Sequence, residues 1–420
     1  MEKSIAHWKA AHPLLFVSAT LLAGILLAKF FFQNKIQPSY AIAIIGIGWL
    51  LLQATLFFPL PSWHRGLLLV LVLLSWGVAI CIATQEKNLM QLPYPKSWVV
   101  FCRNWVIQKI NATIISTEAN GFALALLLGV KSDLNKELLQ AYTQLGIIHI
   151  VAISGMHLEI IFKNLTRITQ WMPRRKIFLL LELFLVLAGV WLYTLMAFGS
   201  PSIVRASVFF SIYFIGKFLQ QSHFTLNTIA GGILILLLLD VKDIGNIGLQ
   251  LSYGAVLGIH LFYPLLHKML PMDNPLMSFL WSNLCVSFAA QLLTLPILVY
   301  HFHQIANLVL VSNLIMVPLS NILLYSLMLL VICPSWLGLA HLLGGWIQNY
   351  ILWINACIHS LYTLPISNSI QIHFDAIQMT LYYAVLWFLY SWLYKQASKY
   401  LVYLLMLFVG YRLLKLFSPV

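Results

Sequence analysis

The chain has 420 residues, of which 61% are hydrophobic and only 8% are charged. A soluble domain carries about 25% charged residues, so this composition excludes a soluble globular protein and predicts a membrane protein. The apolar runs are continuous, about 20 residues long and free of period-two alternation, which predicts α-helices rather than an outer-membrane barrel. The net charge of +13 fits positive-inside loops, anionic lipid contacts or a polyanionic substrate, and does not distinguish them.

We expect an all-α, polytopic helical membrane protein with about 11–13 membrane helices, some of them broken or re-entrant. The first apolar run is long enough to span and lacks a cleavage site, so we expect it to stay in the membrane. Pro318 is expected to break one long run, and residues 336–362 are long enough to be compound. The expected spans are residues 13–32, 40–58, 66–84, 177–198, 201–219, 224–239, 244–266, 276–300, 305–333, 336–362, 376–393 and 400–417.

The organisation expected along the chain has four parts. Residues 1–84 form a three-helix membrane segment, 85–120 an amphipathic linker, 121–333 a channel core, and 334–420 the last membrane helices. The linker holds Trp98, Phe101, Trp105, Val106 and Ile110 near helical spacing, with Lys96, Arg103 and Lys109 between them. This pattern predicts either a helix lying in the membrane interface or a packed surface helix.

Residues 121–163 break the pattern of simple spans. The apolar run 121–130 is too short to cross about 30 Å of hydrocarbon, and the charged segment 131–137 follows it. The next run, 145–162, is interrupted near its middle by Ser154-Gly155-Met156-His157. Such a backbone needs protein or water to satisfy it, which favours a broken helix beside a hydrophilic path. The alternative is a glycine-kinked span in which Ser154 and His157 bond neighbouring helices.

Three further features concern charge and polarity. The basic residues of 163–176 cluster in one short segment, which we place in the cytoplasm. Ser200-Pro201 is a favourable helix start, and Arg205 follows one turn later, where it either faces an anion or extends toward the interface. Residues 276–300 carry four polar side chains within an arc of about 80°, which either line a passage or bond other helices: Asn283, Ser287, Gln291 and Thr294.

Several kinds of chemistry find no support. The chain has no GxxxxGK[ST] motif, so we expect no P-loop ATPase. The five cysteines include no CxxC pair, and the His301-x-His303 pair has no further ligand nearby in the sequence, so we expect neither a disulfide framework nor a metal site. Paired carboxylates and catalytic triads are likewise not recognisable. We therefore expect no cofactor and no enzyme.

Four segments, taken in order, resemble the ComEC-type competence family, the inner-membrane channels for DNA uptake. Residues 125–161 resemble the family's signature segment, and 200–210 its Pro-Ser-x-x-Arg-Ala helix start. Residues 246–259 resemble its Gly-x-Gln-Leu-Ser segment, and 291–319 its Leu-Pro, Phe-x-Gln and Asn-x-x-x-x-Pro region. Larger members carry an oligonucleotide-binding-like domain and a metallo-β-lactamase-like domain. Residues 85–120 are too short for the first, and no HxHxDH sequence supports the second.

The resemblance implies a multi-pass inner-membrane channel that passes single-stranded DNA into the cytoplasm during natural transformation. We expect a separate DNA-binding receptor, a nuclease, and a cytoplasmic motor or single-strand-binding proteins. The alternative is a secondary transporter or lipid-handling protein for a smaller anion, with His157 and Glu159 or Glu182 taking protons. The residues expected along the path are Lys131, His149, Ser154, Gly155, His157, Arg205, Gln250, Ser252, Asn283, Ser287, Gln291, Thr294 and Asn313.

Overall fold

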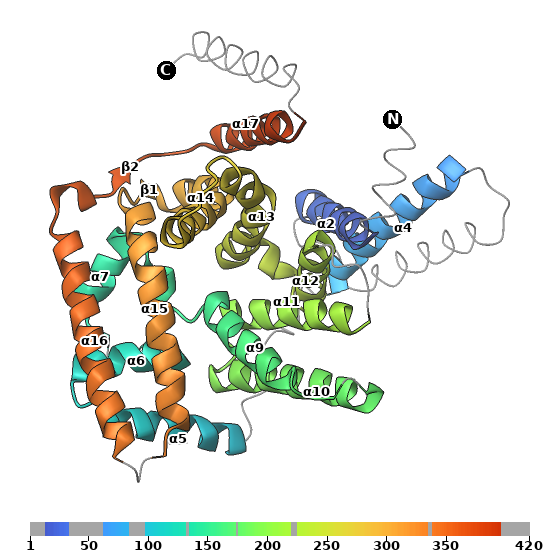
Figure 1. Ribbon diagram of the computed structural model, residues 1–420. Coiled ribbons are helices and arrows are strands. Elements are labelled where there is room, and N and C mark those ends of the chain that lie inside the picture. The colour runs from blue at the N-terminus through green and yellow to red at the C-terminus, as the bar shows by residue number, and fades with distance from the viewer. Residues whose placement is uncertain are drawn as a thin grey trace. The chain divides into compact units, whose positions relative to one another are not determined.

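A computed structural model describes residues 13–32, 62–83, 97–131, 134–173, 175–219, 225–334 and 338–395 (Figure 1). The expected spans 40–58 and 400–417 lie outside these residues. The chain forms two compact units, each built from two separated stretches. Unit 1 comprises residues 1–99 and 158–249, and unit 2 comprises residues 100–157 and 250–420. These units cut across the four consecutive segments expected from the sequence.

The described part of the chain is helical almost throughout, which confirms the expected all-α class. The expected bounds agree with the observed helices to within a few residues at most of the spans. The elements that lie wholly in unit 1 are α2 (Pro13–Phe32), α4 (Ser62–Ala83), α10 (Lys176–Met196), α11 (Pro201–Phe218), α12 (Thr225–Leu239) and the 3-10 helix η1 (Val241–Gly245).

Unit 1 is held together by close packing of small residues and by polar bonds between helices. Gly24 of α2 and Gly77 of α4 each approach the backbone of the other helix so closely that a side chain would collide with it. Small residues let membrane helices approach each other this closely. Such packing matters because lipid chains are as apolar as the side chains, so the hydrophobic effect does not drive the helices together. Helix α12 packs against α2, and the Ser18 hydroxyl donates to Ala230 O at 2.9 Å.

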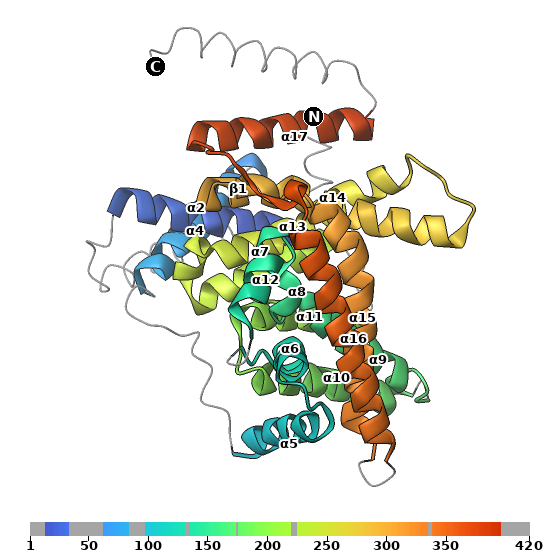
Figure 2. The same ribbon diagram turned by 90° about the vertical axis from the view of Figure 1, so that its left-hand side faces the viewer.

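Unit 2 contains the signature segment and the helices that follow α13. The elements that lie wholly in it are α6 (Thr117–Leu128), α7 (Lys136–Gln144), α8 (Ile148–Val151), α14 (Pro275–Phe302), β1 (Gln304–Ile305), α15 (Val309–Ile332), α16 (Leu339–Tyr362), η3 (Pro365–Ser367), β2 (Ile370–Gln371) and α17 (Ala376–Lys395). Three helices cross the boundary between the units: α5 (Ser97–Thr113), α9 (Gly155–Thr169) and α13 (Ile247–His267). Helices α15 and α16 run side by side, and both pack against α6 (Figures 1 and 2).

The short and broken helices of the signature segment are confirmed. Helix α6 has 12 residues, about 18 Å of helix, and is therefore too short to cross a bilayer. The second apolar run divides into α8 and α9, and the break lies at residues 152–154. Gly155 is already the first residue of α9, so the break falls just before the glycine. It is made by ordinary extended backbone, as at Ala152 (φ −77°, ψ 132°).

The expected break at Pro318 is wrong. Helix α15 continues through Pro318 from Val309 to Ile332. Membrane helices tolerate an internal proline where neighbouring groups satisfy the freed carbonyl. Residues 339–362 are likewise one helix, not a compound of two.

Four of the described helices are long and apolar enough to cross a membrane by length and composition: α10, α13, α14 and α15. Shorter apolar helices lie within α2, α4, α6 and α12. These features define a polytopic helical membrane protein, and the expected number of spans stays a prediction. Helix α16 is not among the four, because polar residues recur along it.

Helix α5 turns its basic side chains inward. Arg103 donates to Leu128 O, at the C-terminal end of α6, at 3.1 Å. Lys109 donates to Val331 O at 3.0 Å and to Cys333 O, at the end of α15. Cations are favourable at these helix ends because the last carbonyl groups are unsatisfied and carry negative partial charge. Phe101 and Trp105 are exposed instead. Val106 and Ile110 are buried as well, so the inward side of the helix mixes apolar and basic residues, and the aromatic side chains of Phe101 and Trp105 face outward.

A two-stranded ribbon follows α14. Strand β1 pairs antiparallel with β2, with Gln304 opposite Gln371. The ribbon brings His373 onto His303, with ring centroids 4.5 Å apart and planes 17° apart. A further histidine therefore stands beside the HxH pair, contrary to what the sequence suggested. Among the described residues, no group of three His, Cys, Asp or Glu is arranged to hold a metal ion.

We expect Gln348→Leu to destabilise unit 2. The Gln348 side-chain oxygen accepts from the backbone N–H groups of Ile115 and Ser116, at 2.9 and 2.8 Å, and so fixes the entry to α6. Leucine would leave both donors without this partner, at a cost of about 1 kcal/mol or more. Thermal unfolding in detergent measures the effect, and the exposed neighbour Asn349→Leu is the matched control. Equal melting temperatures for the two variants would contradict the role of Gln348.

Candidate functional site

Buried polar atoms without a partner mark the candidate site. Such atoms cost about 1–3 kcal/mol each in a dry interior, and in native proteins nearly all are satisfied by protein or water. Within the described residues of unit 2, those that lack a protein partner are His157 Nε2, Gln291 Nε2, His303 Nδ1, Ser312 Oγ, Asn313 Oδ1 and Asn321 Oδ1. We call this set the orphan polar atoms. Their number indicates a region that water or a substrate enters.

The orphan polar atoms lie on three helices and one turn. They belong to the start of α9, to α14 and the turn after it, and to α15. Helix α15 packs against α14 and also against α6 and α8 of the signature segment. Gly146, in the turn before α8, has φ 74° and lies against Val309 and Ala306 at the start of α15. The signature segment therefore packs against α15, the helix that carries Ser312 and Asn313.

His157 closes the start of α9. Its Nδ1 accepts from the backbone N–H of Ser154 at 3.1 Å and lies 2.9 Å from the Ser154 hydroxyl. Because Ser154 directly precedes the helix and His157 is its third residue, the ring takes the place that glutamate or glutamine has in a capping box. Nδ1 is thus an acceptor, and the proton of the neutral ring lies on Nε2. That Nε2 is an orphan donor, and the side chain is fully buried.

The polar stripe on α14 divides into two kinds of residue. Thr294 is buried, donates to Ala290 O of its own helix at 3.0 Å, and faces Gly254 of α13 with its methyl group. Asn283 donates to Phe279 O at 2.9 Å. Both therefore fit the alternative that the stripe serves packing and local bonding. Gln291, between them, keeps an orphan amide nitrogen.

Helix α15 contributes polar residues on its buried side. Ser312 is fully buried, and Asn313 and Ser320 are nearly so. The Ser320 hydroxyl is bonded within the helix, whereas Ser312 Oγ and Asn313 Oδ1 are orphan polar atoms. Asn313 was expected from its resemblance to the family motif. Ser312 was not singled out, because one more serine in an apolar run carries no distinguishing sequence signal.

The other expected path residues are spread over both units. Lys131 and His149 are exposed, in the loop after α6 and on α8. Gln250 and Ser252 lie half-buried on α13, and Ser287 is half-buried on α14. Of the thirteen expected residues, twelve belong to unit 2 and Arg205 belongs to unit 1.

Arg205 is buried one turn into α11, as the sequence predicted for that helix start. Ser200 does occupy the N-cap position, but its side chain makes no capping bond. The guanidinium lies against Gly248 at the start of α13, where an added Cβ would be 3.3 Å from Nη2. Asn246 caps the same helix start by accepting from Gly248 N–H at 2.9 Å. Two segments expected from the family resemblance thus meet inside unit 1.

We expect Arg205→Lys to reduce DNA uptake substantially and Arg205→Gln to reduce it further. Lysine keeps the charge but loses the planar fork that fits this confined position. DNA uptake is measured with the variants at equal membrane abundance, once at low and once at moderate salt. The moderate salt concentration screens diffuse electrostatic effects. Equal uptake by wild type and both variants at both salt concentrations would show that Arg205 has no role in transport.

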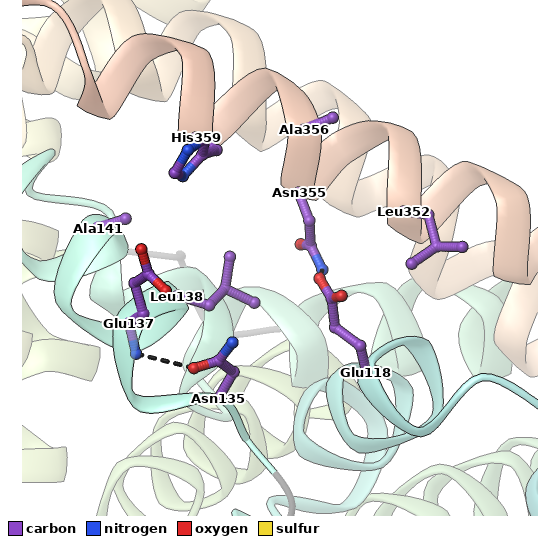
Figure 3. Close-up of a pocket in the computed structure, with 9 residues that line it drawn as sticks. All are labelled: Glu118, Asn135, Glu137, Leu138, Ala141, Leu352, Asn355, Ala356 and His359. Carbon is purple, nitrogen blue, oxygen red and sulfur yellow. Dashed lines mark hydrogen bonds between the residues drawn. The ribbon is translucent and has the colours of Figure 1, made fainter.

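The structure also shows a pocket that no expected residue lines. It has a volume of about 300 Å³ and lies among α6, α7 and α16 (Figure 3). The missed lining residues are Glu118, Asn135, Glu137, Leu138, Ala141, Leu352, Asn355, Ala356 and His359. A signal did exist in α16: His341, Gln348 and Asn355 recur every seven residues, and with His359 they fall within an arc about 40° wide.

A broken helix, orphan polar atoms and long apolar helices together define a membrane protein with buried polar side chains. A sequence profile described as competence protein matches residues 126–396. The chain belongs to the competence protein family. ComE operon protein 3 of Bacillus subtilis (strain 168) is 27% identical over 292 residues, which cover 68% of this chain and 35% of that protein. The chain thus spans about a third of the length of this curated relative. No solved structure matches the chain.

Proposed function

We propose that the chain is an inner-membrane channel core that passes single-stranded DNA into the cytoplasm during natural transformation. The observation that carries the proposal is the set of orphan polar atoms on α9, α14 and α15, within the residues that match the competence family. Phosphates shed their water only at great cost, so a strand needs a hydrated passage with polar walls. Buried polar atoms without protein partners are what such a wall requires.

In this proposal the chain binds and guides the strand and performs no chemistry on it. Each phosphate moved inward against an inside-negative potential costs about 2.3 kcal/mol per 100 mV. The sequence holds no P-loop, so a cytoplasmic motor or single-strand-binding proteins pull the strand. A separate receptor delivers DNA, and a nuclease partner supplies the single strand.

A deletion strain tests the proposal. We expect cells that lack the chain to bind DNA at the surface and to lose its entry into the cytoplasm, and a plasmid copy to restore entry. Labelled DNA followed in fractions inside and outside the membrane measures both steps. Normal cytoplasmic entry in the deletion strain would refute the proposal. Loss of a small anion's transport with normal DNA entry would favour a transporter instead.

A further inference from the structure

We propose that the pocket among α6, α7 and α16 binds an aliphatic diamine or polyamine. This site is separate from the orphan polar atoms and goes beyond the proposed transport of DNA. Two carboxylates line the pocket, from Glu118 in the first turn of α6 and Glu137 in the first turn of α7. Its remaining polar groups are the amides of Asn135 and Asn355 and the ring of His359. A ligand here meets mainly hydrogen-bond acceptors.

Asn355 is built into the pocket rather than lying on its rim. Its side chain is only 5% exposed, and its Nδ2 donates to Glu118 Oε1 at 2.7 Å. Its Oδ1 lies 3.5 Å from the Tyr142 hydroxyl, at the outer limit for a hydrogen bond. Figure 3 shows the Asn355 amide and the Glu118 carboxylate pointing toward each other. This buried amide oxygen has two lone pairs and can accept from a second donor beside Tyr142.

No basic side chain pairs with the pocket carboxylates in the described residues, and only the N-terminal ends of α6 and α7 favour their negative charge. The chain carries 24 Lys and Arg against 11 acids, yet in the described residues neither Glu118 nor Glu137 forms an ion pair. The Glu137 carboxylate also makes no hydrogen bond within the described structure; only its backbone N–H is bonded, to Asn135 Oδ1 at 2.9 Å. Two carboxylates in one concave site attract a cation, and they repel the phosphates of DNA.

The arrangement suits two amine groups joined by methylenes better than a metal ion. In Figure 3 the Leu138 side chain lies between the two carboxylates, and Ala141 and Leu352 add apolar wall. Within the described residues no group of three His, Cys, Asp or Glu side chains is arranged to hold a metal ion. An aliphatic chain covers the apolar wall, while its ammonium ends reach Glu118 and Glu137.

Binding of spermidine and 1,4-diaminobutane to the full chain tests the proposal. The protein is placed in nanodiscs of zwitterionic lipid, without DNA, and titrated by calorimetry at about 0.15 M salt, where diffuse attraction is screened. We expect saturable binding of both amines and at least about tenfold weaker binding of butylamine, which has one ammonium group. Mg²⁺ at equal ionic strength should not displace spermidine.

Matched variants locate the site. Glu118→Gln and Glu137→Gln should each weaken spermidine binding about tenfold, because each removes one charge-assisted bond. Glu159→Gln is the control, since Glu159 is an exposed acid paired with Lys163 at 2.6 Å on α9. Unchanged binding in both pocket variants, or equal binding of butylamine, would overturn the proposal. If Glu118→Gln fails to fold, spermidine binding by Glu137→Gln tests the proposal alone. We expect this variant to fold, because the Glu137 carboxylate makes no hydrogen bond or ion pair within the described structure.

Discussion

Replacing Gln291 with leucine is expected to lower DNA uptake at least tenfold and to leave the protein folded in the membrane. Leucine keeps most of the side-chain volume on α14 and removes an orphan amide nitrogen. In a dry interior this change would stabilise the protein by about 1–3 kcal/mol, because an unsatisfied donor disappears. Along a hydrated path it would remove a polar wall group and exclude water. Uptake per folded molecule and the melting temperature are measured together.

Phe288→Leu is the control for this prediction, because Phe288 lies one turn earlier on α14 and is exposed. It should change neither uptake nor stability by much. If Gln291→Leu takes up DNA normally, Gln291 does not line the path. If it unfolds in detergent while uptake per folded molecule is unchanged, its amide holds helices together.

Replacing His157 with glutamine is expected to preserve the fold and to impair uptake, whereas alanine should damage both. Glutamine at the third helical position can still accept from the Ser154 N–H, as in an ordinary capping box. Alanine loses the cap, at about 1 kcal/mol, and leaves a cavity where a fully buried ring stood. Glutamine cannot place a donor where the ring places Nε2–H.

Thermal unfolding separates the two His157 variants, and uptake at equal membrane abundance tests the ring itself. Glutamine should melt close to wild type, with uptake several-fold lower. Wild-type uptake in His157→Gln would mean that His157 serves only to start α9. Equal destabilisation by glutamine and alanine would contradict the capping role.

Span positions and the helix break could be predicted from the sequence because both depend on local features. Apolar run length set most of the helix bounds, and the polar residues around Gly155 located the break to within a few residues. The break predicted at Pro318 was wrong, because whether a proline breaks a membrane helix depends on which neighbouring groups satisfy the carbonyl it leaves unbonded. On α5 the sequence spacing predicted a helix, but the inward side combines part of the expected apolar set with the basic residues, which bond the carbonyl ends of α6 and α15.

The candidate site was predictable only in part, because it too depends on contacts between separate helices. His157, Gln291 and Asn313 were expected, and each holds an orphan polar atom. Thr294 was indistinguishable from Gln291 by spacing alone, and only the contact with Gly254 shows its packing role. Glu118, Glu137 and His359 come from three separate helices, so no sequence window contains the pocket they line.

Thiol labelling during DNA uptake tests the hydrated path most directly. Single cysteines replace Asn313 and Gln291 in a chain whose five native cysteines are changed to serine or alanine. The matched controls are Val311 and Phe288, which are exposed on the same two helices and which we expect to face lipid. We expect a charged, water-soluble thiol reagent to label positions 313 and 291, and a strand stalled in transit to protect them. Labelling no faster than at 311 and 288, or labelling unaffected by the stalled strand, would contradict the hydrated path.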